Sequence, residues 1–349
     1  MSRRPQVVDL RSSGWPPLFK GLAVFCKEFT PPDFVVGRIV QSGRVLSLTG
    51  ITGTGKTEFL KNIALAMATG REDILGIPVR KGRVAVLAIE NPDDFRNRVM
   101  VSAHVLGIDI AEVNRTIMVA DRKEPPEEVF RRLKSFDHKL PISLVLIDTL
   151  QAYFDGSNFN DPVEAGEFIR RLHPLTTVEG RPSVIIAAHP VKTASQDQLI
   201  PYGSGAILNE IDGNLTLWRA PKSDVVTLHW SGKFRGEDFA PLRFRFETVS
   251  APNVVDSTGR ELTLPMLRPA GGEAGIELSG STVPSSTRLL KAMLAAPGAP
   301  QRTWGEAVPC SQAMVRKHLA WLLKRDLVEA VKGSWRVTET GVKEAAKWL

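Results

Sequence analysis

The residues best suited to chemistry in this sequence form one short run from Gly50 to Thr57, Gly-Ile-Thr-Gly-Thr-Gly-Lys-Thr. It fits the phosphate-loop pattern of Gly, four residues and then Gly-Lys-Thr. Glycines let backbone amides close around phosphate oxygens, and the N-terminus of a following helix favours an anion. The pattern predicts a site for ATP and Mg²⁺, although nothing recognisable reads the base, so GTP stays open. Its expected members are Gly50, Thr52, Gly53, Thr54, Gly55, Lys56, Thr57 and Glu58.

Two roles within this run follow from residue type. Lys56 is expected to reach the β- and γ-phosphates, and the Thr57 hydroxyl to hold Mg²⁺. The apolar run from Val45 to Leu48 predicts a strand before the loop, and the spacing of apolar residues from Glu58 to Ala68 predicts a helix after it. A glycine turn without a ligand is the alternative, but this strand, loop and helix context favours a nucleotide site.

Acidic residues close two further apolar runs. Asp148 ends the run that begins at Ser143, where a carboxylate supporting Mg²⁺ belongs; capping of the next turn is the alternative. Glu90 ends the run from Arg83, and Thr149 rather than an acid follows Asp148. We therefore predict Glu90 as the general base that orients the attacking water, against the alternative of a helix cap.

Three basic residues complete the predicted catalytic set. His189 lies at the tip of the run from Ser183 and is expected to sense the γ-phosphate, although a lone histidine is often structural. Lys233 and Arg235 stand two residues apart in a predicted turn between late strands, so their side chains point the same way. In a ring of subunits they would act on a neighbour's nucleotide; two solvated turn cations are the alternative.

The alternation of short apolar runs with helical stretches predicts an α/β fold with a mostly parallel sheet. Later runs, spaced like hairpins, predict antiparallel strands that extend this sheet, the outline of a RecA-type core. The predicted divisions are an N-terminal arm at 1–43, the core at 44–250, a Pro- and Gly-rich linker at 251–284 and a small domain at 285–349.

The last division is basic and helical. It carries 11 Lys and Arg against 5 Asp and Glu, and so holds nearly all of the net charge of +7. Its expected order of three helices, a hairpin and a final helix is typical of a winged helix-turn-helix, whose third helix enters the DNA major groove. Arg316, Lys317 and Lys324 on that helix are predicted to contact DNA; a helical interaction domain with solvated charges is the alternative.

Composition limits the other classes. An apolar content of 43% over 349 residues suits a globular protein, and no stretch is long and apolar enough for a membrane span. The N-terminus lacks the apolar segment of a secretory signal. The two cysteines, Cys26 and Cys310, suit a reducing compartment and exclude a cysteine-based zinc cluster. We expect a cytoplasmic protein.

Taken together, the core over about residues 15–250 resembles the RepA-like ATPases of the RecA-fold hexameric helicases. The resemblance rests on the phosphate loop, the runs from Ala88 to Asp94 and from Leu146 to Asp148, the strand ending in His189, the run from Tyr202 to Ala206, and Lys233 with Arg235. It implies a homo-oligomeric ring, expected to be a hexamer, with Glu90 as base, His189 coupling nucleotide state to DNA-facing loops, and Arg235 acting on the adjacent subunit. The C-terminal domain lies outside it.

The leading hypothesis is a ring-forming DNA helicase or replication ATPase of a plasmid, phage or mobile element. The loops at Gln151–Glu164 and Pro190–Gly203 would face single-stranded DNA, offering Tyr153, Phe154, Phe159 and Lys192. Replication proteins are possible partners. The alternatives are an ATP-controlled DNA-binding regulator or helicase loader without unwinding activity, and an ATPase unrelated to nucleic acids.

Overall fold

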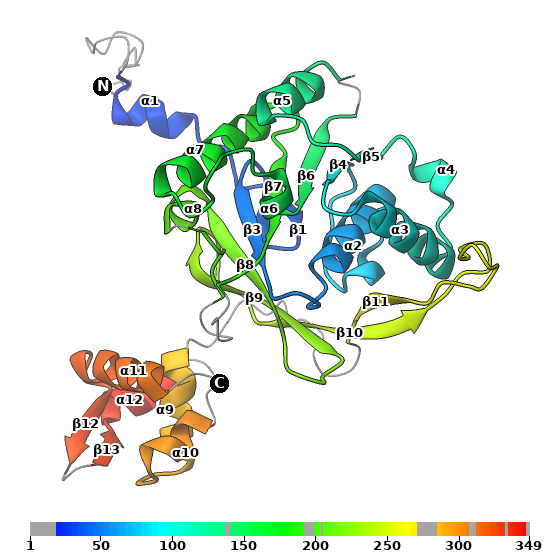
Figure 1. The fold of residues 1–349 in the computed structure, drawn as a ribbon. Coiled ribbons are helices and arrows are strands. Elements are labelled where there is room, and N and C mark those ends of the chain that lie inside the picture. Colours follow the sequence, from blue (N-terminus) through cyan, green and yellow to red (C-terminus); the bar gives the residue numbers. More distant parts are fainter. Residues whose placement is uncertain are drawn as a thin grey trace, which may run out of the picture.

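A computed structural model of the chain describes residues 19–136, 140–191, 199–203, 205–270, 285–306, 312–331 and 334–346 (Figure 1). Its main part is built on strands β3 Val45–Thr49, β4 Arg83–Ala88, β5 Ile117–Ala120, β6 Ile142–Asp148, β7 Ser183–Ala188, β8 Gly213–Arg219, β9 Val225–Phe234, β10 Leu242–Val249 and β11 Leu264–Pro269. They form one sheet in the order β11-β10-β9-β8-β3-β7-β6-β4-β5.

The sheet is mostly parallel, as predicted. Strand β3 pairs in parallel with β7 on one side and β8 on the other, and β6, β4 and β5 continue the parallel order. Strands β8 to β11 then pair antiparallel. The predicted α/β core with an antiparallel extension is therefore present, and the carboxyl ends of β3, β4, β6 and β7 meet along one edge.

Helices cover both faces of this sheet. They are α2 Lys56–Thr69, α3 Pro92–Leu106, α4 Ile110–Val113, α5 Pro126–Lys134, α6 Leu150–Tyr153, α7 Pro162–Leu172 and α8 Gly205–Glu210, with 3-10 turns at Glu72–Ile74 and His173–Thr177. Figure 1 shows α2 and α3 on one face and α5 and α7 on the other.

Alternate residues of the central strands feed two separate cores. On β6, Leu144 and Leu146 pack in the core beneath α2 and α3, whereas Val145 and Ile147 pack in the core beneath α7. A strand covered on both faces has no solvent side, which explains why the sequence shows continuous apolar runs rather than alternation.

Two predicted boundaries need correction. Strand β11 lies within residues 251–284, which were predicted as a linker. It pairs antiparallel with β10, with Phe244 opposite Pro269 at one end and Val249 opposite Leu264 at the other. Its two prolines suggested a loop, but β11 is the edge strand at this end of the sheet, where proline is tolerated. Similarly, Lys233 lies in β9 and not in a turn, because β9 continues to Phe234.

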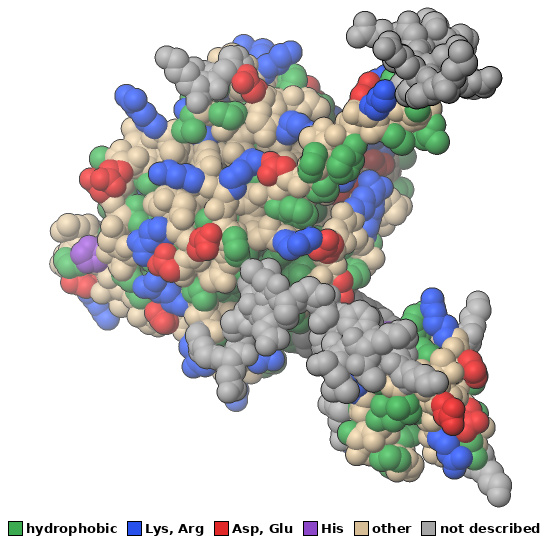
Figure 2. Space-filling view, turned by 180° about the vertical axis from the view of Figure 1, so that it is seen from behind, with side chains coloured by type: hydrophobic (Ala, Val, Ile, Leu, Met, Phe, Trp, Pro, Cys, Tyr) green, Lys and Arg blue, Asp and Glu red, His purple; other side chains and the backbone are tan. Residues whose placement is uncertain are grey.

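The predicted N-terminal arm also divides. Strands β1 Phe34–Val36 and β2 Val40–Gln41 pair with each other, and their apolar side chains join the core beneath α2. Helix α1 Leu22–Lys27, in contrast, contains no buried residue. Phe19, Leu22, Phe25 and Phe29 are all more than half exposed, and Figure 2 shows apolar side chains at the surface there.

The C-terminal unit has a core of its own. It comprises α9 Ser285–Ala295, α10 Gln301–Glu306, α11 Gln312–Lys324, the hairpin β12 Val328–Val331 with β13 Ser334–Val337, and α12 Glu339–Ala346. The apolar spacing in the sequence of α11 predicts a stripe of Val315, Leu319, Leu322 and Leu323, and the first three are buried. Leu323, predicted to share that stripe, is 46% exposed, because at i+8 from Val315 it lies at the edge of the apolar face, where none of the described elements covers it.

In the part of the chain that the structure describes, no helix combines the length and apolarity needed to cross a membrane.

Candidate functional site

The phosphate loop lies between β3 and α2, as predicted. Its backbone turns through positive φ values at Gly53 and Gly55, +81° and +93°. A Cβ on Gly55 would come within 2.8 Å of the Phe246 ring, so glycine is required there for both conformation and space. The Thr54 hydroxyl donates to the Ile51 carbonyl at 2.8 Å and closes the turn from within.

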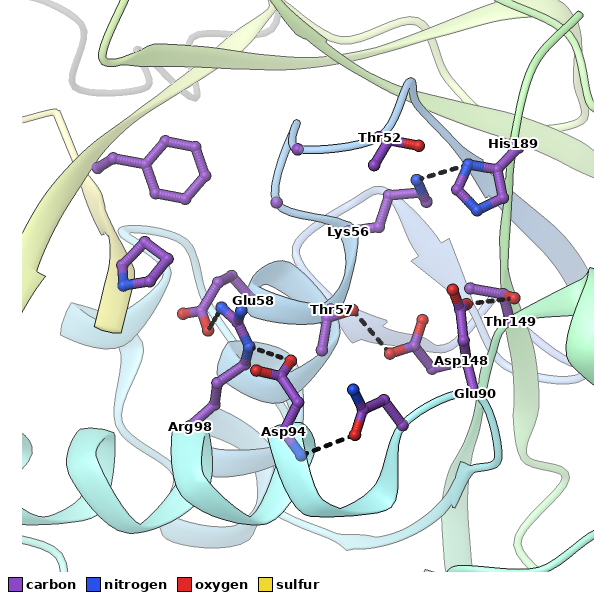
Figure 3. A pocket seen from close by; sticks show the side chains of 15 residues that line it. Thr52, Lys56, Thr57, Glu58, Glu90, Asp94, Arg98, Asp148, Thr149 and His189 are labelled. Atoms are coloured by element: carbon purple, nitrogen blue, oxygen red, sulfur yellow. Dashed lines mark hydrogen bonds and ion pairs between the residues drawn. The ribbon is translucent and has the colours of Figure 1, made fainter. Parts of the chain in front are cut away.

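A cavity of about 270 Å³ opens beside this loop (Figure 3). In Figure 3 Lys56 and His189 approach each other at one end, and Glu58, Asp94 and Arg98 lie toward the other. The lining residues are Thr52, Gly53, Gly55, Lys56, Thr57, Glu58, Glu90, Asn91, Asp94, Arg98, Asp148, Thr149, His189, Phe246 and Pro265. Among the predicted nucleotide-binding residues, Gly50 and Thr54 shape the loop without lining the cavity.

Lys56 is held above the loop. Its ammonium donates to the Gly50 carbonyl at 2.8 Å, and its Nζ lies 3.4 Å from His189 Nδ1. Burial lowers the pKa of Lys56 to about 8, against the opposing pull of Asp148 and Glu90. The ammonium is thus mostly charged at neutral pH and suited to bind phosphate oxygens.

Thr57 and Asp148 fit a magnesium ion. The Thr57 hydroxyl donates to Asp148 Oδ2 at 2.8 Å, while Asp148 Oδ1 is buried without a hydrogen-bond partner among the described residues. Burial, and next the nearby Glu90, raise the pKa of Asp148 to about 6, so the carboxylate is charged at neutral pH. A buried, unpartnered carboxylate oxygen beside a hydroxyl is an oxygen donor set that Mg²⁺ accepts. When bound, the ion would neutralise charge on the phosphates.

Glu90 comes to the same place through sheet pairing. Ala88 of β4 is in register with Asp148 of β6, and the backbone N–H of Glu90 donates to the Asp148 carbonyl at 3.1 Å. The Thr149 hydroxyl donates to Glu90 Oε2 at 2.6 Å. The residue that replaces an acid after Asp148 therefore holds the predicted base in the cavity, within reach of a water at the phosphate end.

His189 follows β7 and lines the cavity. Burial, and next the nearby Lys56, lower the pKa of His189, so its ring is neutral at pH 7. Its carbonyl accepts from the backbone N–H of Tyr202 at 2.6 Å, and Pro190 and Pro201 form an antiparallel bridge beside it. Movement of His189 would thus be transmitted directly to Tyr202.

Glu58 has a different part from the one predicted. It is 1% exposed, and its two carboxylate oxygens accept from Lys61 at 2.6 Å and from Arg98 at 2.9 Å. Arg98 also donates to Asp94 at 2.5 Å. Glu58 therefore lines the cavity mainly as the anchor of Arg98. Sequence reasoning missed Asp94 and Arg98; their i, i+4 spacing on the helix after Glu90 was the available signal.

Lys233 and Arg235 lie away from the cavity. Phe234 is in register with Gly213 at the start of β8, so this end of β9 adjoins the amino end of β3, opposite the phosphate loop. Lys233 donates to the Asn209 carbonyl at 2.5 Å, and Arg235 Nη1 lies 3.0 Å from Asp212 Oδ1. The two cations do not reach the nucleotide cavity of their own chain, and their predicted action on a neighbour stays a prediction.

The residues predicted to contact nucleic acid are only partly described. Arg316 is exposed on α11, whereas Lys192 and the side chains of Lys317 and Lys324 lie outside the described residues. Tyr153, predicted to face DNA, is 1% exposed and packs edge-on against Phe168 at 5.6 Å. That prediction is wrong, because Tyr153 belongs to a turn of helix directed into the core. Phe159 is half-buried and stacks on Tyr202 at 6.1 Å.

Residues 21–195, just over half of the chain, match the family model described as AAA domain, AAA_25. The chain therefore belongs to this family of P-loop ATPase-like domains. No curated protein matches the sequence. The matched segment includes the phosphate loop, Glu90, Asp148 and His189, and ends before the antiparallel strands.

Proposed function

We propose that the chain is an ATP-hydrolysing RecA-fold motor that forms a ring and moves on DNA, a helicase or replication ATPase of a plasmid, phage or mobile element. The observation that carries hydrolysis is the placement of Glu90: Thr149 holds its carboxylate at 2.6 Å in the same cavity as Lys56 and Asp148. The ring and the DNA substrate are proposed because the sequence motifs of the core resemble those of RepA-like ATPases.

The chain's own residues supply each part of the reaction. Lys56 binds the β- and γ-phosphate oxygens and balances their charge, and Thr57 with Asp148 would hold the magnesium ion. Glu90 orients the attacking water and accepts its proton. Thr149 fixes the carboxylate so that no reorganisation is needed when the water arrives.

Action on DNA is supported by the path from His189 to an aromatic pair. Tyr202 is hydrogen-bonded through its backbone to His189, is 37% exposed and stacks on Phe159 from the connection between α6 and α7. Aromatic rings on adjacent loops can stack bases of a single strand. A change at the γ-phosphate would reach this pair within one hydrogen bond.

The test is the ATPase rate with and without single-stranded DNA, together with strand displacement and molecular mass with a non-hydrolysable ATP analogue. We expect stimulation, displacement and a ring. Glu90→Gln should bind ATP normally and hydrolyse it about 10²- to 10⁴-fold more slowly. Normal turnover by Glu90→Gln would remove Glu90 from the mechanism, and absence of stimulation and displacement would contradict the motor.

A second candidate, an ATP-controlled DNA-binding regulator or loader, is favoured by the C-terminal unit. That unit has a separate core, the element order of a winged helix, and an exposed Arg316. Deleting residues 285–349 should weaken duplex binding and lower the log–log salt slope by about 0.9 per lost phosphate contact. Tight duplex binding by the full chain without displacement would favour the regulator; unchanged binding after deletion would favour a protein-docking role for the unit.

A further inference from the structure

The cavity has an apolar wall that no sequence motif marks. Phe246 of β10 and Pro265 of β11 line it, and both come from the antiparallel extension of the sheet. The phosphate loop, Lys56 and Glu90 account for the phosphates and the attacking water. The Phe246 and Pro265 wall is then left for the nucleoside, the uncharged part of a nucleotide, whose base has an apolar π-face.

The Phe246 ring is held in position against the phosphate loop. The Arg219 guanidinium lies 4.8 Å from the ring centroid, and Arg219 Nη1 donates to the Gly53 carbonyl at 3.1 Å. The ring also lies so close to Gly55 that a Cβ there would come within 2.8 Å of it, and the Phe246 backbone N–H donates to the Asp224 carbonyl at 2.8 Å. A ring fixed in this way offers a platform that is formed before the ligand arrives.

Three charged side chains that line the cavity, Glu58, Asp94 and Arg98, are already paired with one another. Both carboxylate oxygens of Glu58 accept from cations, Asp94 Oδ2 accepts from Arg98 Nε, and Arg98 Nη1 donates to Glu58. Among the described residues, Arg98 Nη2 keeps its donors for a ligand. This free donor discriminates little, because every nucleotide offers acceptors on its ribose, phosphates and base. The second oxygen of Asp94 belongs to a side chain that is 36% exposed to water, so it is not a buried acceptor built to read one base.

We propose that the Phe246 and Pro265 wall stacks the nucleobase without reading its hydrogen-bonding edge. The substrate class is then nucleoside triphosphates in general rather than ATP alone. This inference rests on the proposed nucleotide-binding function. A site built to hydrogen-bond one base rejects others by about 10⁴-fold, whereas stacking tolerates every base because each has a π-face.

The experiment measures dissociation constants of ADP, GDP, CDP and inorganic tripolyphosphate for the full chain, Phe246→Ala and Phe246→Leu. Phe239→Ala is the matched control, because Phe239 lies in the connection from β9 to β10, outside the cavity lining. For the wild type we expect the three nucleotides to bind within about tenfold of one another. Phe246→Ala should weaken all three by about 10- to 100-fold and leave tripolyphosphate unchanged, with Phe246→Leu between the two.

Three outcomes would overturn the proposal. The first is that the wild type binds one base more than about 100-fold more tightly than the others. The second is that Phe246→Ala binds ADP as tightly as the wild type does. The third is that both Phe246 variants lose affinity for tripolyphosphate and for ADP equally. The last would assign the ring to loop geometry. Failure of the proposed function itself would look different: the wild type would bind neither nucleotides nor tripolyphosphate, and Lys56→Ala would change nothing.

Discussion

The nucleotide cavity and the Lys233 and Arg235 pair lie at opposite ends of β3. They differ in whether their polar side chains have hydrogen-bond partners and opposite charges beside them. Among the described residues, Asp148 Oδ1 in the cavity is buried without a hydrogen-bond partner, and the buried Lys56 ammonium has only carbonyls and a histidine nitrogen as hydrogen-bond partners. At the other end, Arg235 has a carboxylate partner in Asp212, which also accepts from the Val45 backbone at 3.1 Å.

This difference separates two kinds of site. Groups that are buried and poorly compensated are prepared for a ligand that completes them, so binding is expected to belong to a single chain. Arg235 is compensated and its side chain is 60% exposed, so it can leave Asp212 at small cost when a better anion approaches. Binding and turnover should therefore respond differently to substitutions at the two ends.

The largest effect is expected for Lys56→Ala. Loss of the cavity-lining Lys56 ammonium should reduce both nucleotide affinity and hydrolysis below detection, at least about 10³-fold. Equilibrium binding of ADP and steady-state ATPase measure the two. Lys233→Ala, at the other end of the sheet, is the control for affinity. Normal nucleotide affinity in Lys56→Ala would contradict the assignment of the phosphate loop.

Arg235→Ala should separate the two properties. Nucleotide affinity of one chain should stay within about twofold, while turnover of the assembled protein falls by about 10³-fold or more if Arg235 acts on a neighbour. Mixing Arg235→Ala with Glu90→Gln should restore some activity, because some interfaces then have both residues intact. No recovery at any ratio, with assembly confirmed, would show that Arg235 does not act in trans.

Asp148→Asn tests how far the buried carboxylate of Asp148 destabilises the fold when no metal is bound. The folded pKa of about 6 lies above the ordinary 3.8, so ionisation above pH 6 destabilises the metal-free fold. Stability that is present below pH 4 is lost as pH rises through 6, by about 3 kcal/mol in total, of which about 1.4 falls between pH 5 and 8. In urea unfolding with EDTA, the free energy of unfolding of Asp148→Asn should rise relative to that of the wild type as the pH increases from 5 to 8. Asp121→Asn, at an exposed position, is the control and should show no such rise. A difference in unfolding free energy between Asp148→Asn and the wild type that does not change with pH would contradict this prediction.

The smallest effect is expected for Asp212→Asn. The amide keeps an acceptor for the Val45 N–H but removes the charge that holds Arg235. Because Arg235 is well exposed, solvent screening should limit the loss of unfolding free energy to about 1 kcal/mol. Nucleotide affinity should not change. A fall in affinity comparable to that of Lys56→Ala would join the two ends into one site and remove the distinction drawn between them.

The sequence was sufficient where function is local. The phosphate loop carries its strand, glycines and helix within about 25 residues, and the apolar runs predicted the parallel strands because both of their faces are buried. Glu90 and Asp148 could be assigned together because parallel pairing brings strand ends to one edge. Whether Tyr153 and Leu323 are exposed or buried could not be predicted, because it depends on which neighbouring elements complete each core.

The nucleoside wall was invisible for a related reason. Phe246 lies some 190 residues from Gly55, and its ring is brought there by antiparallel strands whose edge member, β11, contains prolines and follows a stretch with loop composition. Neither residue type nor spacing marks such a contact. Arg98 differs in that its i, i+4 spacing from Asp94 was visible in the sequence, but its place in the cavity depends on Glu58 from a different helix.

The order of the strands has a practical consequence for dividing this protein. A fragment ending at residue 195, where the family match ends, would keep the cavity residues Lys56, Glu90 and Asp148 but lose β8, leaving one side of β3 as a bare edge next to the phosphate loop. Unpaired edges of apolar strands invite association between chains. The smallest fragment that keeps β3 paired and the cavity walled must therefore run to about residue 270, well beyond what the family match alone would suggest.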